Sequence, residues 1–139
     1  MISPRLISIG FALTSPMLQF LGTHATAISS FVYKRDPIGL HNIHTGEVTT
    51  FIPGLEACGG RNTSPDFVVA VNSAVFEQFR DVICDNKAMG VTAFGMTLVL
   101  RIADECLTCG PDDIALSPGA FEFFLPVSAG EFEAQWLIE

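Results

Sequence analysis

The segment from Asp104 to Phe121 constrains the fold more than any other part of this 139-residue chain. It follows the mostly apolar run Leu98–Ala103, which predicts a strand that delivers Asp104 to its end. A Cys-x-x-Cys pair and Gly110-Pro111 come next, and Ser117-Pro118 then predicts a helix start with Ser117 as the N-cap. A strand end, a cysteine-pinned loop and a helix start within eighteen residues predict a small fold built from short elements.

Residues 1–27 are typical of a secretory signal peptide. Arg5 is followed by an apolar stretch over residues 6–22 and then by Ala25-Thr26-Ala27, which has the small-x-small pattern of signal-peptidase cleavage. Pro16 interrupts the apolar stretch, so removal is favoured over membrane anchoring. The alternative is a buried N-terminal helix of a cytosolic protein. We expect a secreted, extracellular protein.

The dibasic pair Lys34-Arg35 is of the kind cut by kexin-type proteases of the secretory pathway, which would make residues 28–35 a propeptide. An uncut, exposed basic pair is the alternative. Cleavage leaves residues 36–139, with four basic against fifteen acidic residues and a net charge of −11. Such acidity argues against nucleic acid and anionic membranes as partners, because both attract positively charged proteins.

Four cysteines, an even number, lie in this mature part: Cys58, Cys84, Cys106 and Cys109. In a short secreted chain they predict two disulfides, and the sequence leaves three pairings open. Zinc binding or a redox-active pair at the Cys-x-x-Cys is the competing interpretation. Zinc sites usually have a second such pair or paired histidines, and redox pairs usually begin a helix. We therefore predict no metal and no cofactor. Asn62-Thr63-Ser64 is a candidate N-glycosylation acceptor.

The remaining patterns predict many short strands and two short helices. Strands are expected over residues 45–52 and 66–71, twice within 89–103 on either side of Gly95, and over 131–138, where apolar and polar residues alternate. Helices are expected over residues 74–79, capped by Ser73, and over 118–124. This pattern indicates a mainly β domain that closes into a small barrel, which also removes exposed strand edges.

Seven landmarks, in order, resemble secreted barrel domains of the expansin, barwin and rare-lipoprotein-A type, especially small single-domain fungal members. They are Gly46-x-x-Thr49-x-Phe51, Gly54-Leu55-x-Ala57-Cys58-Gly59, Phe67-Val68-Val69-Ala70-Val71-Asn72, Cys84, Asp104-x-Cys106-x-x-Cys109, Asp113-Ile114-x-Leu116-Ser117-Pro118-x-Ala120-Phe121 and Gly130-x-Phe132-x-x-x-Trp136. The resemblance covers residues 45–137, essentially the whole mature chain.

The resemblance implies a six-stranded double-psi β-barrel with an open groove across one face. Expansin-like members hold polysaccharide in that groove and loosen cell-wall glycans without evident hydrolysis. Bacterial relatives cleave peptidoglycan strands, single-domain relatives include papain-type protease inhibitors, and barwin-like members are plant defence proteins. The fold alone therefore does not decide the function.

Two groove residues of the family are matched here, the threonine by Thr49 and an aspartate by Asp104. The second aspartate, associated with activity in relatives, is replaced by Ala115, and Asp113 lies two residues away. Cleavage of glycans normally needs a positioned proton donor, usually one of two carboxyl groups. We therefore expect Thr49, Asp104 and Asp113 to bind a ligand and the protein not to be an enzyme.

Asp104 is the one candidate catalytic residue, and three roles are open for it. Its carboxylate can accept backbone N–H bonds that hold the Cys106–Cys109 loop, it can bind glycan hydroxyls, or it can act as an acid or base. Phe51, Phe94 and Phe123 are the candidate exposed phenylalanines for sugar stacking.

Other notable residues have structural interpretations. Trp136 matches a core position of the family, and Glu131 and Glu133 are expected on a solvated strand face. His41 and His44 precede the first strand and are interpreted as solvated loop residues.

Three functions follow from these observations. The first is a non-catalytic, monomeric module that binds cell-wall polysaccharide through the groove. The second is a papain-type protease inhibitor or host-directed effector that acts through loops 58–65 and 106–113, which disulfides would rigidify. The third is a glycan-cleaving enzyme, which the alanine at position 115 disfavours.

Overall fold

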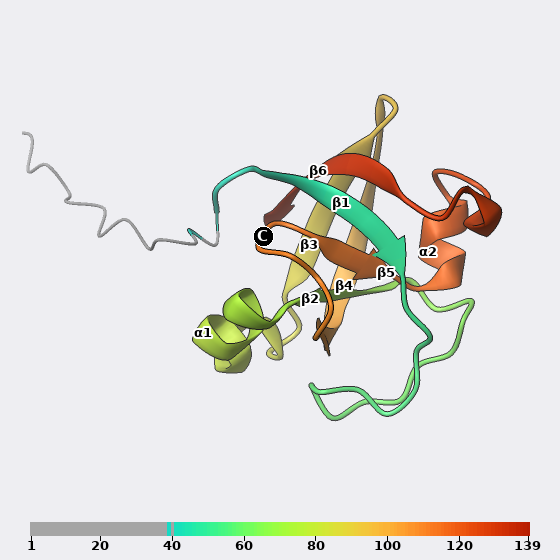
Figure 1. Ribbon diagram of the computed structural model, residues 1–139. Helices are drawn as coiled ribbons and strands as arrows, with labels where there is room; N and C mark the ends of the chain where they lie inside the picture. The colour runs from blue at the N-terminus through green and yellow to red at the C-terminus, as the bar shows by residue number, and fades with distance from the viewer. Residues whose placement is uncertain (1–38, 40) are drawn as a thin grey trace, which may run out of the picture. The chain divides into compact units, whose positions relative to one another are not determined.

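Six strands form a closed barrel in the computed structural model, which describes residue 39 and residues 41–139 (Figure 1). The predicted signal peptide and dibasic site lie outside the described residues. The strands are β1 (His44–Thr50), β2 (Val68–Asn72), β3 (Ala88–Ala93), β4 (Met96–Cys106), β5 (Ile114–Leu116) and β6 (Phe132–Ile138). The helices are α1 (Ser73–Ile83), α2 (Pro118–Glu122) and the single 3-10 turn η1 (Val127–Ala129).

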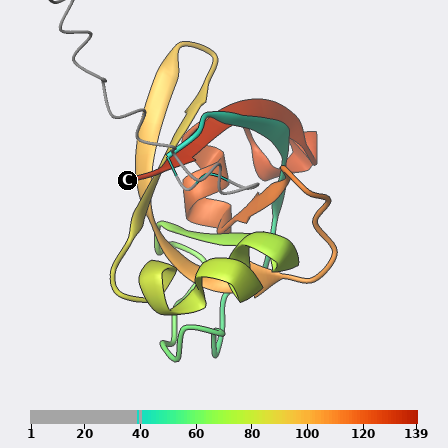
Figure 2. The same ribbon diagram turned by 90° about the vertical axis from the view of Figure 1, so that its left-hand side faces the viewer.

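The strand order around the barrel is β1-β5-β2-β4-β3-β6, and β6 pairs with β1 to close it. The β1–β5 and β2–β4 pairs are parallel, and the other four pairs are antiparallel. In Figures 1 and 2 the β3–β4 hairpin extends at one end of the barrel, while α1 and the connection from β1 to β2 lie toward the other. The mainly β barrel with two short helices is therefore confirmed.

Side-chain alternation explains the barrel core. Along β6, Phe132, Ala134, Trp136 and Ile138 are buried, while the residues between them are exposed or half-buried, as the period-two pattern predicted. Trp136 is 2% exposed and donates from Nε1 to the carbonyl of Asp112 at 2.7 Å, so its polar atom is also satisfied.

The first helix differs from its prediction at both ends. Asn72, not Ser73, is the N-cap, and its side-chain oxygen accepts a bond from the backbone N–H of Val75 at 3.0 Å. The helix then continues to Ile83, which is fully buried, instead of ending at Phe79. Burial of Ile83 extends the helix beyond the segment with the clearest amphipathic pattern, although the rest of its last turn is exposed.

Ser117 precedes α2 as predicted, but its hydroxyl does not cap that helix. It accepts a bond from the backbone N–H of Val68 at 3.2 Å and donates to the carbonyl of Asp66. The side chain is fully buried and therefore fixes the start of β2. The predicted cap role is wrong because this neighbouring strand supplies both hydrogen-bond partners.

Two disulfides engage all four cysteines. Cys58 pairs with Cys84, which links the β1–β2 connection to the end of α1, and Cys106 pairs with Cys109 across the loop after β4. The prediction of two disulfides is confirmed, and the structure selects one of the three pairings. Neither helix in the described part of the chain has the length and apolar character that a membrane crossing requires.

Candidate functional site

Barrel register brings two of the predicted ligand residues onto one line across four strands. Thr49 of β1 is paired with Ala115 of β5, Ala115 is paired with Ala70 of β2, and Ala70 is paired with Asp104 of β4. Thr49 and Asp104 are half-buried at the two ends, and both alanines between them are buried. We call these four residues the transverse row.

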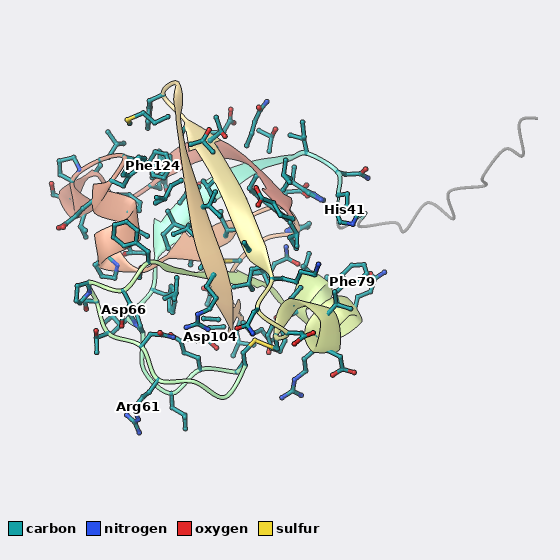
Figure 3. All side chains as sticks on the ribbon, turned by 180° about the vertical axis from the view of Figure 1, so that it is seen from behind. His41, Arg61, Asp66, Phe79, Asp104 and Phe124 are labelled. Carbon is teal, nitrogen blue, oxygen red and sulfur yellow. A yellow bond between two sulfur atoms is a disulfide. The ribbon has the colours of Figure 1, made fainter. Side chains whose placement is uncertain are left out.

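The Asp104 carboxylate is engaged with backbone. Its Oδ1 accepts from the N–H of Ala57 at 2.8 Å and from the N–H of Glu105 at 2.9 Å. The backbone N–H of Cys58 also donates to the carbonyl of Ala103 at 3.2 Å. Asp104 therefore holds the β1–β2 connection against β4 instead of the expected Cys106–Cys109 loop, and Figure 3 shows it where β4 meets the loop that Arg61 marks. It lies within β4, two residues before its end.

Asp113 has a comparable structural role on the opposite side of the row. Its Oδ1 accepts from the backbone N–H of Glu47 at 2.8 Å, and its Oδ2 accepts from the N–H of Gly110 at 3.1 Å. Both oxygens are thus occupied in joining β1 to the turn before β5. A carboxylate held in this way has a fixed position and little freedom to follow a ligand.

Position 115, where the resemblance implies an aspartate, is closed to solvent. Ala115 is 2% exposed and packs with Ala70 and Cys106, and Phe51 and Cys109 pack against this small cluster. The middle of the transverse row is therefore apolar and covered. Phe51, one of the three phenylalanines that were candidates for exposure, is half-buried there, whereas Phe94 and Phe123 are 61% and 41% exposed.

Three large aliphatic side chains stand exposed on the two loops that flank this row. Ile52 is 89% exposed, Leu55 is 74% exposed and Leu107 is 80% exposed. Phe51 and Cys109, from the same two loops, pack on one cluster, so both loops border the row. We call Ile52, Leu55 and Leu107 the exposed aliphatic trio.

Both loops that carry the exposed aliphatic trio are braced. The first is tied to α1 by the Cys58–Cys84 disulfide and to β4 through Asp104, and it closes on itself in a bridge between Leu55 and Arg61. The second lies within the Cys106–Cys109 ring. The predicted recognition loops, residues 58–65 and 106–113, include Leu107 but neither Leu55 nor Ile52, and Ile52 lies after the end of β1 instead of in the predicted strand 45–52. The available signal was aliphatic residues on either side of Pro53-Gly54 and another inside a Cys-x-x-Cys ring, outside any alternating or helical pattern.

The prediction that His44 is a solvated loop residue is wrong. It belongs to β1, its side chain is only 11% exposed, and its ring stacks on Trp136 with centroids 4.1 Å apart. Its Nδ1 lies 2.9 Å from Oδ1 of Asp112. The β1–β6 pairing places His44 opposite Trp136 and creates this stack. His41 is exposed, as expected, with Nδ1 lying 3.2 Å from the carbonyl oxygen of Ile138.

A shallow depression of about 520 Å³ lies over β1 and β6, and carboxylates line most of it. Of the predicted ligand residues only Asp113 lines it, together with Gly46, Glu47, Glu131, Phe132 and Glu133. Repulsion from the Glu131 carboxylate raises the pKa of Glu47. Glu131 and Glu133 are exposed, as predicted. Across residues 41–139, no group of three or more His, Cys, Asp or Glu side chains is placed to hold a metal ion.

The sequon asparagine is held on both sides of its amide. Nδ2 of Asn62 donates to Oε2 of Glu56, and Oδ1 of Asn62 accepts from Arg101 of β4 at 2.8 Å. Asn62 is half-buried, and its nitrogen is the atom to which a glycan would be attached. Glycosylation of Asn62 stays a prediction. A glycan attached there would have to project past the side chains of Glu56 and Arg101.

Comparisons with known proteins establish the fold and no more. No protein-family model matches the chain, and no curated protein matches it in sequence. The Streptomyces papain inhibitor (SPI) has a similar structure, with a TM-score of 0.65 and 24% identity over 72% of this chain and 96% of that one.

The expansin of Clavibacter michiganensis is also similar. A mutant in complex with cellohexaose gives a TM-score of 0.62 at 21% identity, and the apo protein gives 0.58 at 19%. Each match covers 70% of this chain and 50% of the expansin, so this chain spans about half of that protein's length. These likenesses confirm the double-psi β-barrel of expansin-like proteins. Both neighbours are bacterial, and the fungal type stays a prediction.

Proposed function

We propose that this protein is a secreted binding module that docks on a papain-type cysteine protease through Ile52, Leu55 and Leu107. The single observation that carries the proposal is that these three side chains, each at least 74% exposed, stand on braced loops at the flanks of one row. Exposed aliphatic residues on a rigid frame bind at low entropic cost, because little order is lost on association.

The state of the two aspartates supports protein recognition over glycan chemistry. Asp104 and Asp113 accept backbone N–H bonds and so build the loops. The alanine at position 115 is buried in an apolar cluster, which leaves the row without its second acid. The Streptomyces papain inhibitor, which the match covers over 96% of its length, has this fold and provides a named precedent for the partner class.

Inhibition of papain by the purified domain tests the proposal. We expect the triple variant Ile52→Ala, Leu55→Ala, Leu107→Ala to lose most of the inhibition, since each anchor side chain lost from an interface costs about 1–2 kcal/mol, or roughly 5–30-fold in affinity. The matched control is Val99→Ala on the outer side of β4, where the side chain is 54% exposed. Absence of inhibition by the wild-type protein, or equal loss in the control, would refute the proposal.

Binding of cell-wall polysaccharide is the second candidate, and one observation favours it. Thr49 and Asp104 are aligned at the two ends of the row and are both half-buried, so each retains some contact with solvent. A Clavibacter michiganensis expansin with this fold was crystallised with cellohexaose. Retention on cellulose, chitin or β-glucan that is lost in Thr49→Ala would establish this function, and no retention on any of them would remove it.

We further propose that the mature protein comprises residues 36–139, released after a signal peptide of residues 1–27 and a propeptide of residues 28–35. The two disulfides support an oxidising, extracellular destination. The intact mass of the secreted chain tests the boundaries and also shows whether Asn62 carries a glycan.

A further inference from the structure

Glu56 is a buried carboxyl group that neither proposed function uses. The residue is 4% exposed, although it lies in a surface loop next to the outward-facing Leu55. Its Oε2 accepts a hydrogen bond from Asn62, while its Oε1 is buried and has no hydrogen-bond partner. An ionised carboxylate in such a place is costly, because it has lost water and gained only one donor.

The charges that face Glu56 oppose its ionisation more than they favour it. Burial raises the pKa of Glu56, Asp104 and Asp66 raise it further, and Asn62 and Arg101 lower it. Arg101 of β4 donates to Asn62, and within residues 41–139 Glu56 has no salt bridge to any basic group. Arg101 therefore lowers the pKa of Glu56 through space, without a direct contact, while its own hydrogen bond goes to Asn62.

The same carboxyl group sits at the closure of the loop that presents Leu55. Within residues 54–62, the N–H of Glu56 donates to the carbonyl of Gly60 at 3.0 Å, and the N–H of Asn62 donates to the carbonyl of Gly54 at 3.1 Å. The Asn62 side chain then joins Glu56 to β4 through Arg101. Opening of residues 54–62 would release Glu56 to water and displace Leu55.

We propose that residues 54–62 close on β4 with Glu56 in its protonated, neutral form, so that acidification tightens this loop and strengthens docking through Leu55. The second effect rests on the proposed function, whereas the first concerns the chain alone. The Glu56 carboxyl group, buried with one oxygen unpartnered beside Asp104, is the sensor, and the loop is the element that responds.

The direction of the pH effect follows from the linkage between proton binding and loop closure. A carboxyl group with a higher pKa in the closed loop than in water binds its proton more tightly when the loop is closed. The closed loop therefore gains stability as the pH falls through the raised pKa of Glu56, until the pH reaches the ordinary value for glutamate. Above the raised pKa the closed loop is weakest. The ratio of closed to open loop changes by up to about tenfold for each unit by which closure raises that pKa.

Hydrogen exchange tests the loop without any partner. The amides of Ala57 and Asn62 report closure, because they donate to Asp104 and to the carbonyl of Gly54. After correction for intrinsic rates, we expect their protection to rise as the pH falls from about 7.5 toward about 4.3, the ordinary pKa of glutamate. Glu56→Gln keeps the shape without the charge and should hold high protection at both pH values. Constant protection in the wild-type protein, or a variant that follows the wild type, would overturn the proposal.

Papain binding tests the second effect. We expect the ratio of the papain affinity at about pH 5 to that at about pH 7.5 to be larger for the wild-type protein than for Glu56→Gln. Comparison of the two ratios cancels the protease's own response to pH. Glu77→Gln, an exposed change on α1, is the control and should keep the wild-type ratio. Equal ratios in wild type and Glu56→Gln would overturn the effect on docking. No papain binding at all would refute the proposed function and the effect on docking, and exchange would still decide the pH response of the loop.

Discussion

Replacement of Asp104 separates the structural role of its carboxylate from a chemical one. In Asp104→Ala the N–H groups of Ala57 and Glu105 lose their common acceptor, which lies 2.8 and 2.9 Å away in the native protein. Each hydrogen bond to a charged group contributes about 1.5–3 kcal/mol, and water can replace part of it at this half-buried site. We therefore expect a loss of about 2–3 kcal/mol in the free energy of unfolding.

Asp104→Asn is the informative partner of that variant. The amide oxygen of asparagine can still accept both bonds, so we expect the free energy of unfolding to stay within about 1 kcal/mol of wild type. Urea denaturation followed by tryptophan fluorescence measures the free energy of unfolding of both variants, because the one tryptophan, Trp136, lies in the core. Asp85→Ala, in the exposed turn after α1, is the control.

The two variants also distinguish the functions. If Asp104 acts only through the loop, Asp104→Asn retains papain inhibition while Asp104→Ala weakens it. If the free energy of unfolding of Asp104→Ala lies within about 0.5 kcal/mol of the wild-type value, the bonds to Ala57 and Glu105 do not hold the loop, and the structural argument fails. Loss of glycan retention in the stable Asp104→Asn variant would instead favour a direct role in sugar binding.

Three further stability changes follow from packing, each measured by urea denaturation. Ala115→Asp, which introduces the acid that the sequence resemblance implies at this position, should cost more than about 2 kcal/mol because the site is buried and apolar; an unchanged midpoint would show that the site opens readily. Gly46→Ala should cost at least about 2 kcal/mol, since a Cβ there would lie 1.9 Å from the carbonyl oxygen of Asp112; near-native stability would mean that the turn at Asp112 can move. Ser117→Ala should cost about 1–3 kcal/mol, because it strips the N–H of Val68 of its acceptor in the core, and a smaller loss would mean that water replaces the hydroxyl.

Patterns that depend on neighbours along the chain predicted the structure well. The alternation over residues 131–138 identified β6 and its buried face, and the break at Gly95 identified the β3–β4 hairpin. β5 was not predicted as a strand from its residues. It has three residues, Ile114–Leu116, all buried, so neither alternation nor length could signal it. It exists because β1 and β2 both supply pairing partners.

The predictions that were wrong concern side chains for which the sequence allowed more than one hydrogen-bonding or packing partner. Asn72 and Ser73 are adjacent candidates for the same cap, and only Asn72 can also donate from Nδ2 to the carbonyl of Pro111. His44 and Trp136 are ninety-two residues apart, so their stack depends on the β1–β6 register and leaves no trace in local sequence. In each case a tertiary partner decided between choices of similar local energy.

The candidate site shows where prediction from single residues stops. Thr49 and Asp104 could be named from a motif, but their alignment depends on β5 being inserted between β1 and β2, and on the register shift that pairs Ala70 with Asp104. Without that shift Ala70 would be paired with Ala103, and Asp104 would have no place on the row. The shift therefore lets the Asp104 carboxylate hold the loop that presents Leu55. A change that removes this carboxylate should disturb the exposed aliphatic trio before it disturbs the barrel core.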